Sequence, residues 1–191
     1  MKNPTLAFQA KSFFNVYLNL LNFDAHNSVS NFIVPAVVNG AFSAELALKS
    51  MLTERGIPYG REHSLLELFL LLPHDFINEF LCKFYERTSQ YHDTDKWMEE
   101  LILISNAFVD WRYCFEKGPL PAFHFDYFDA FIFAAFCVVS NHYDVDMVER
   151  TGSDMTAGKL DIMIEQNRAD SKERIMNAFY KKRQKPSSHR E

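Results

Sequence analysis

The stretch KWMEELILISNAFVDWRYCFE, residues 96–116, carries the clearest hydrophobic pattern in the chain. Its apolar side chains recur at spacings of three, four, three and four, at Leu101, Ile104, Phe108, Trp111 and Phe115. Residues three and four apart share one face of an α-helix, so the spacing predicts a single helix over 96–116 with one apolar stripe. A stripe of this kind is covered by a neighbouring helix, which favours a helical bundle.

Local signals place further helices along the chain. Asn3 followed by Pro4 is typical of a helix N-cap and the first helical residue. Ser64 with Glu67 matches a capping box, in which each residue bonds the backbone N–H of the other. Gly56 stands where a helix-ending residue of left-handed conformation belongs. The helices expected besides 96–116 cover residues 4–23, Ser28 or Ser30 to Arg55, 65–72, 74–89 and 126–149.

These helices predict an all-α fold, an antiparallel bundle of five to six helices. The chain has only six Gly and seven Pro among 191 residues, too few turn residues for an all-β fold. We expect one bundle domain over residues 1–151. Residues 152–191 are expected to form a polar, basic tail or an appended helix.

Charge is unevenly distributed along the chain. Residues 172–191 carry seven basic and two acidic residues, whereas residues 1–171 carry 13 basic and 23 acidic residues, a net charge of −10. A body this acidic repels phosphate backbones at long range, which argues against broad nonspecific binding of nucleic acid. A local basic site or the tail itself can still contact RNA.

Cysteine usage and hydropathy indicate a cytoplasmic protein. Cys82, Cys114 and Cys137 are far apart and odd in number, which is typical of free, mostly buried thiols and not of a disulfide framework or a zinc site. The densest apolar run, 130–139, is much shorter than the ~20 residues of a membrane span. We expect no membrane association, no metal and no cofactor.

Two segments of the chain carry a recognisable pattern. The first is AELALKSML, residues 44–52, followed by Gly60, His63 and spaced leucines that end at Leu72 before a proline. The second is FVDWRYCFE, residues 108–116. Together they resemble the HEPN superfamily of small helical bundles, over roughly residues 30–145. The resemblance implies an α-helical fold, dimerisation, and a role in bacterial toxin or defence systems.

The resemblance also implies a possible catalytic motif, because many members of this superfamily cut RNA without metal through Arg-x(4–6)-His on a late helix. There the Arg holds the phosphate and the His acts on the 2′-hydroxyl. This chain departs from that pattern, since Arg112 is followed by Glu116 and not by a histidine. Arg87 and His92 do fit the spacing, but they lie at the predicted end of a helix and before the matching segment.

Two pairs of polar residues have both a structural and a functional interpretation. Glu45 and Lys49 are four apart in the favourable order, so either they form a surface ion pair or Lys49 faces His63. Arg112 and Glu116 are also four apart, and form either a partly buried ion pair or a surface with Arg112 turned to a ligand.

The leading hypothesis is a HEPN-like binding module, homodimeric and without catalytic chemistry. Its ligand would be a nucleotide, RNA or another protein such as an antitoxin, docking near the groove between the second helix and the Trp111 helix. The candidate ligand-binding residues are Glu45, Lys49, His63, Arg112 and Glu116. Two alternatives stay open: a metal-independent ribonuclease that uses either Arg87 and His92 or a site centred on Arg112, and a structural partner whose basic tail, 172–190, contacts an acidic surface.

Overall fold

The computed structural model describes residues 4–27, 32–113, 116 and 122–143, and these residues form helices without any strand. Their all-α architecture confirms the predicted fold class. In chain order the helices are α1 (Pro4–Asn27), α2 (Ile33–Glu54), α3 (Leu65–Leu70), α4 (His74–Arg87), α5 (Thr94–Ile104), α6 (Ala107–Arg112) and α8 (Phe125–Tyr143).

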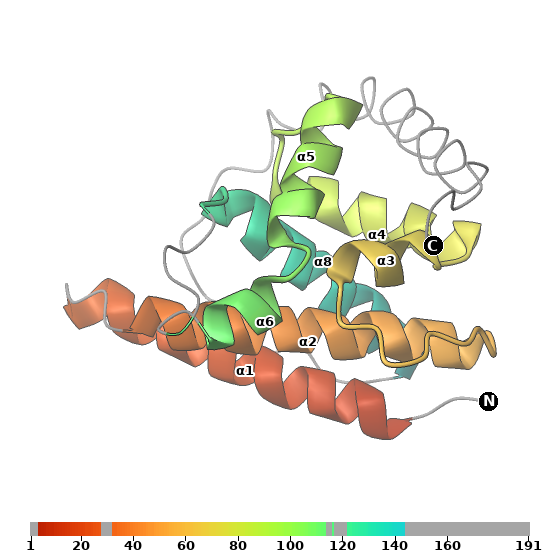
Figure 1. Cartoon of the computed structure of the whole chain (residues 1–191), viewed down its shortest axis with the longest axis horizontal. Helices are drawn as coiled ribbons and strands as arrows, with labels where there is room; N and C mark the ends of the chain where they lie inside the picture. The colour runs from red at the N-terminus through yellow and green to blue at the C-terminus, as the bar shows by residue number, and fades with distance from the viewer. Residues whose placement is uncertain (1–3, 28–31, 114–115, 117–121, 144–191) are drawn as a thin grey trace.

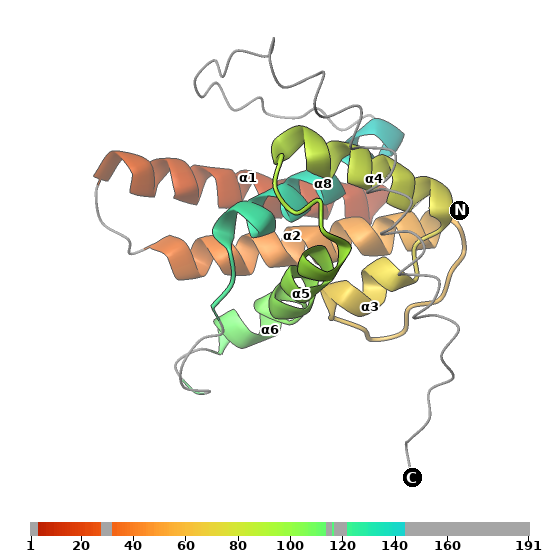
Figure 2. The same cartoon turned by 90° about the horizontal axis from the view of Figure 1, so that it is seen from above.

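The helix α2 is the central element of the bundle. It runs antiparallel to α1 along most of its length, and α8 packs against both of them (Figure 1). The helices α3 and α6 pack on α2 too, so α2 lies between α1 on one side and the α3, α5 and α6 group on the other (Figure 2). Most of α2 from Ala36 to Leu52 is buried, polar residues included.

Close approach of α1, α2 and α8 depends on Gly40. A Cβ atom at this position would lie 2.6 Å from Cδ1 of Ile132 on α8 and 2.9 Å from a ring carbon of Tyr17 on α1. Both distances are shorter than carbon atoms tolerate. The glycine therefore sets how closely the three helices pack around the middle of α2.

The aromatic cluster of α8 builds the core of the bundle. Four of its rings, Tyr127, Phe128, Phe131 and Phe136, are fully buried. Phe131 packs edge-on against Phe80 of α4, with ring centroids 4.9 Å apart. These contacts join α8 to α4 across the centre of the bundle.

The prediction of one continuous helix over 96–116 was wrong. The structure has α5 ending at Ile104 and α6 beginning at Ala107. At the break the carbonyl oxygen of Ser105 accepts a hydrogen bond from the Leu65 N–H (2.8 Å), and its hydroxyl lies 2.6 Å from the hydroxyl of Ser64. Ser105 therefore forms hydrogen bonds with the start of α3, and α5 does not continue past it.

Several predicted helix ends were corrected or confirmed. The Ser64 hydroxyl accepts from the Glu67 N–H (3.2 Å) as predicted, but Glu62, and not Glu67, accepts from the Ser64 N–H (2.8 Å). Gly56 has the predicted left-handed φ of 66°. α2 begins at Ile33 without a side-chain cap, and the two serines proposed for it fall in 28–31, outside the described residues.

Three further expectations concern helix ends, domains and membranes. α4 ends at Arg87, two residues before the predicted end, because Thr88 is extended. The expected domain boundary near residue 152 and the basic tail lie outside the described residues. Among the helices that the structure describes, none combines the length and the hydrophobicity that a membrane crossing requires.

Candidate functional site

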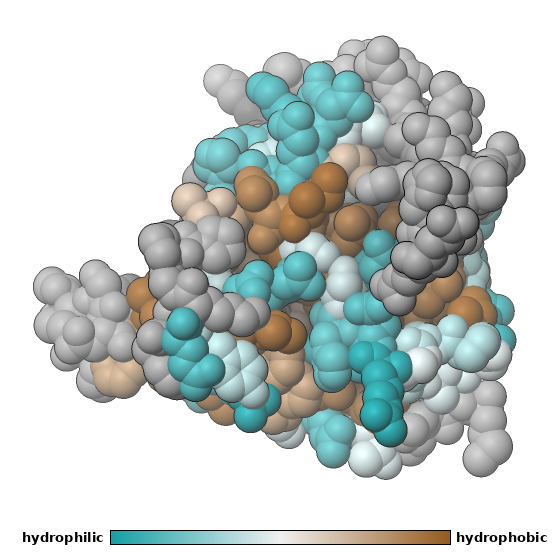
Figure 3. Space-filling model, in the orientation of Figure 1, coloured by the Kyte–Doolittle hydropathy of each residue, from teal (hydrophilic) through white to brown (hydrophobic). Residues whose placement is uncertain are grey.

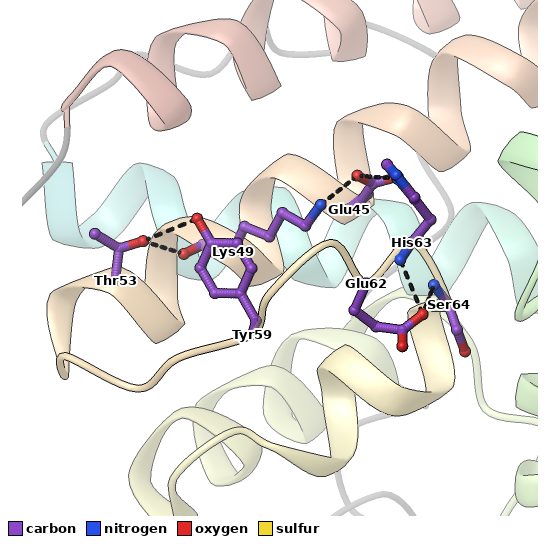
Figure 4. Close-up of polar contacts among 7 residues, drawn as sticks. All are labelled: Glu45, Lys49, Thr53, Tyr59, Glu62, His63 and Ser64. Atoms are coloured by element: carbon purple, nitrogen blue, oxygen red, sulfur yellow. Dashed lines mark hydrogen bonds and ion pairs between the residues drawn. The ribbon is translucent and has the colours of Figure 1, made fainter.

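A charged cluster lies on the side of α2 that faces the loop before α3. Glu45 and Lys49 stand one turn apart on α2, and Nζ of Lys49 donates to Oε1 of Glu45 at 2.7 Å. Nδ1 of His63, from the loop, lies 2.9 Å from the same oxygen (Figure 4). Lys49 therefore pairs with Glu45, but the pair is buried and not on the surface as expected, and Lys49 points toward His63.

Burial divides this cluster into a fixed and an accessible part. The Glu45 side chain is 1% exposed and the Lys49 side chain is nearly as buried, whereas the His63 side chain is 51% exposed. The second carboxylate oxygen of Glu45, Oε2, is buried and has no hydrogen-bond partner among the described residues. A buried carboxylate is stable only when paired, and Lys49 supplies the compensating charge.

Two loop residues hold the cluster in place. Oε1 of Glu62 accepts from the backbone N–H groups of His63 (2.9 Å) and Ser64 (2.8 Å), which fixes the end of the loop at the start of α3. The Tyr59 ring lies 5.5 Å from Nζ of Lys49, within the range of a cation–π contact (Figure 4). Sequence reasoning missed both residues, because neither stands at a spacing that marks it in the sequence.

The helix α6 extends the site from His63 to Arg112. The ring of Phe108 lies 6.3 Å from the His63 ring and stacks on Phe42 of α2 at 4.6 Å. The guanidinium carbon of Arg112 is 5.7 Å from the centre of the Phe108 ring and 5.4 Å from that of Tyr113. Arg112 is exposed and has no carboxylate partner among the described residues.

The arrangement brings together four of the five predicted ligand-binding residues. Glu45, Lys49 and His63 are in direct contact, and Arg112 joins them through the ring of Phe108. Glu116 is exposed and makes no ion pair with Arg112, so the hypothesis of a buried pair was wrong. The reason is that α6 ends at Arg112, which removes the helical geometry that would bring the two residues together.

The two residues of the predicted catalytic motif have separate partners. Nε and Nη2 of Arg87 donate to Oδ2 of Asp129 at 3.0 and 2.8 Å, and the hydroxyl of Tyr17 donates to the other oxygen of Asp129 at 2.7 Å. His92 instead stacks on the ring of Tyr85 at 5.3 Å. The structure therefore shows Arg87 tying α4 to α8, with no contact between Arg87 and His92 among the described residues.

Two other histidine–carboxylate pairs connect helices away from this site. Nδ1 of His124 lies 2.6 Å from Oε1 of Glu100, which joins α5 to the start of α8. Nε2 of His142 lies 2.9 Å from Oε2 of Glu79, which joins the end of α8 to α4. Within the described ranges, no group of three or more His, Cys, Asp or Glu residues is arranged to hold a metal ion.

Fold and site together define a class: an α-helical bundle whose central helix carries a buried, charge-paired polar cluster. The model of the HEPN domain matches residues 17–119, a little over half of the chain, and this chain belongs to the HEPN family. The match contains α2, the loop and α6, and so all candidate site residues. No curated protein and no solved structure shows significant similarity to the chain.

Proposed function

We propose that this HEPN protein binds a nucleotide through its α2–α6 site, defined as Glu45, Lys49, His63, Arg112 and the ring of Phe108. The observation that carries the proposal is the exposed guanidinium of Arg112, which lies beside two aromatic rings and has no carboxylate partner within the described part of the chain. A guanidinium matches the geometry of a phosphate group, and the ring of Tyr113, which is exposed, can stack on a base. Family membership is consistent with a nucleotide- or RNA-related module.

The charge balance of the site supports an anionic ligand. Glu45 and Lys49 neutralise each other within the cluster, so Arg112 contributes the charge that a ligand meets. Arg61, two residues before His63, is a further exposed cation without an acidic partner among the described residues. A phosphate placed here would gain charge-assisted hydrogen bonds without breaking an existing ion pair of Arg112.

The distribution of charge over the whole chain favours a small ligand over a long RNA. Residues 1–171 carry a net charge of −10, which repels an extended phosphate backbone but affects a single nucleotide much less. The proposal is for binding alone. It includes self-association of the protein as a homodimer.

The test is a titration of the purified protein with ATP, GTP and a short single-stranded RNA by calorimetry. Arg112→Ala is expected to weaken nucleotide binding at least about tenfold, since hydrogen bonds to charged groups contribute roughly 1.5–3 kcal/mol each. Lys96→Ala is the matched control, because Lys96 on α5 is also an exposed cation without an acidic partner in the described structure. Its effect is expected to stay within about twofold.

Two results would contradict the proposal. One is the absence of binding by any of the three probes at millimolar concentration. The other is equal affinity of the Arg112→Ala variant and the parent protein. RNA cleavage in the presence of EDTA would instead favour the ribonuclease alternative, and its loss in Arg87→Ala or His92→Ala would assign the activity to those residues.

A further inference from the structure

The two ring nitrogens of His63 have different surroundings. Nδ1 lies 2.9 Å from Oε1 of the buried Glu45, whereas Nε2 has no hydrogen-bond partner among the residues that the structure describes. The side chain is half-exposed, and hydrophilic side chains gather over the loop that carries it (Figure 3). Nε2 is therefore the end of the ring that a ligand arriving from solvent can meet.

The contact with Glu45 decides which nitrogen of the neutral ring carries the proton. Oε1 of Glu45 is a carboxylate oxygen paired with the Lys49 ammonium, so it accepts hydrogen bonds and donates none. Nδ1 is then the N–H of the neutral imidazole, and Nε2 is left with a lone pair. The oxygens of an ionised phosphate also offer only lone pairs. Nε2 of His63 can therefore bond to such an oxygen only when the ring is an imidazolium, which donates from both nitrogens.

From this geometry we propose that His63 contacts phosphate in its protonated form, so that nucleotide binding to the α2–α6 site takes up a proton. The proposal rests on the nucleotide site proposed above and adds how that site depends on pH. Arg112 supplies positive charge to the ligand at every physiological pH. His63 adds its charge when the ligand binds, and the affinity for an anion rises as the pH falls.

His63 and Arg112 lie close enough together to contact one nucleotide. The Phe108 ring lies between them, with its centre 6.3 Å from the centre of the His63 ring and 5.7 Å from the guanidinium carbon of Arg112. The imidazole centre and the guanidinium carbon are therefore at most about 12 Å apart. Charge-assisted hydrogen bonds are about 2.8 Å long, so a chain of linked phosphates such as that of ATP can reach both groups.

The charge of the cluster couples the proton to the ligand. With neutral His63, the Glu45 carboxylate and the Lys49 ammonium cancel each other. Protonation of the ring keeps the hydrogen bond of Nδ1 to Glu45, makes it charge-assisted, and leaves the cluster with one positive charge in excess. An anionic ligand balances that charge. The proton and the ligand therefore each favour the binding of the other.

His63 is the group around this site whose charge is expected to change near neutral pH. Histidine is the side chain that ordinarily changes its charge between about pH 5 and pH 8. The other charged residues on the elements around it are lysine, arginine, aspartate and glutamate: Glu45 and Lys49 of α2, Arg61 and Glu62 of the loop, Glu67 of α3, and Asp110 and Arg112 of α6. A change of affinity over this pH range is therefore assigned to His63.

Calorimetric titration with ATP at about pH 6 and about pH 8 tests the pH dependence. The parent protein is expected to bind ATP at least about fivefold more tightly at the lower pH, because the imidazolium adds a hydrogen bond between charged groups. His63→Gln stays neutral at both pH values and is expected to lose most of this difference. His124→Gln is the matched control, because Nδ1 of the exposed His124 also contacts a largely buried carboxylate, that of Glu100. Its pH dependence is expected to equal that of the parent.

Proton uptake is a second measurement, which a purely structural role of His63 would leave unchanged. Titration with ATP at about pH 7 in two buffers of different ionisation enthalpy gives the number of protons taken up on binding. Protonation of ATP itself contributes to the value for both proteins, so the difference between the parent and His63→Gln reports on His63. The parent is expected to take up a measurable fraction of a proton more than the variant.

The outcomes separate this inference from the proposed nucleotide site. Equal pH dependence and equal proton uptake in the parent and His63→Gln would overturn the role of His63 while leaving the nucleotide site intact. Absence of ATP binding at both pH values would overturn the two together. Should His63→Gln fail to fold by circular dichroism, the NMR shifts of the His63 ring in the parent decide. Addition of ATP is expected to move them toward those of an imidazolium, and unchanged shifts on binding would contradict the proposal.

Discussion

At the scale of single residues, the sharpest contrast is between cations that are already paired and cations that are not. Arg87 contacts Asp129 through two nitrogen atoms and also lies 5.0 Å above the ring of Phe133. Within the described ranges, the contacts found for the Arg112 guanidinium are with aromatic rings. A guanidinium that is already bonded to a largely buried carboxylate stabilises the folded state, whereas a guanidinium without a carboxylate partner can bind a ligand.

The structural role of Arg87 leads to a prediction about stability. Arg87→Ala is expected to lower the free energy of unfolding by about 1–3 kcal/mol, because it leaves one oxygen of the largely buried Asp129 without a donor. Urea denaturation followed by circular dichroism measures this change. Neither nucleotide affinity nor the level of any RNA cleavage is expected to change.

Arg55→Ala is the matched control for this prediction. Arg55 also pairs with an aspartate, Asp75, and also lies 5.0 Å from a phenylalanine ring, but both members of its ion pair are exposed. Exposed ion pairs contribute at most about 1 kcal/mol. Full stability of the Arg87→Ala variant, combined with loss of an RNA-cleaving activity, would contradict the structural role.

At the scale of helices, the break between α5 and α6 shapes the site. Had residues 96–116 formed one straight helix, Phe108 and Arg112 would continue in the direction of α5. Instead α6 packs on α2 beside the loop, and Phe108 reaches both Phe42 and His63. The break is stabilised by the hydrogen bonds between Ser105 and the start of α3.

The cap of α3 can be tested directly. Ser64→Ala removes a side-chain cap and the partner of the Ser105 hydroxyl, so it is expected to cost about 1–2 kcal/mol of stability. Ser89→Ala is the control, since Ser89 is exposed and outside any helix, and its change is expected to stay below about 0.5 kcal/mol. Thermal unfolding measures both variants. Equal melting temperatures for the two would show that the cap contributes nothing measurable.

At the scale of the whole molecule, one aromatic core joins the helices. Phe14 of α1 stacks on Phe136 of α8 at 4.4 Å, and Trp97 of α5 lies 5.6 Å from Tyr127 of α8. Burial raises the pKa of the Tyr85 and Tyr127 hydroxyls, and it raises the pKa of the Cys137 thiol to about 12. The pKa of Tyr91 is also raised, by burial and by its hydrogen bond to Asp126.

These raised pKa values predict loss of stability at alkaline pH. The folded protein keeps these groups protonated, whereas the unfolded chain ionises cysteine near pH 8.5 and tyrosine near pH 10. Their contribution to stability is therefore complete below about pH 8 and decreases as the pH rises toward 12. Tyrosinate absorbance, helical circular dichroism and alkylation of Cys137 are expected to change together over this range. Alkylation of Cys137 with the helices intact would contradict the prediction.

Much of the fold could be predicted because helix formation is largely local. The spacing of apolar residues, the Ser64 cap and the left-handed Gly56 each depend on neighbours a few positions away. The pair of Glu45 and Lys49 was predictable for the same reason, since residues four apart meet on any helix. The division of 96–116 was not, because the Ser105 carbonyl bonds to Leu65, forty residues earlier.

The sequence by itself determined the all-α bundle, the family resemblance and the pairing of Glu45 with Lys49. Only the tertiary structure decided which distant residues meet: His63 on Glu45, Phe108 on His63, and Arg87 on Asp129. The physical reason is the range of the interactions. Helical periodicity acts over three to four residues, whereas these contacts join residues that are adjacent only after the helices have packed.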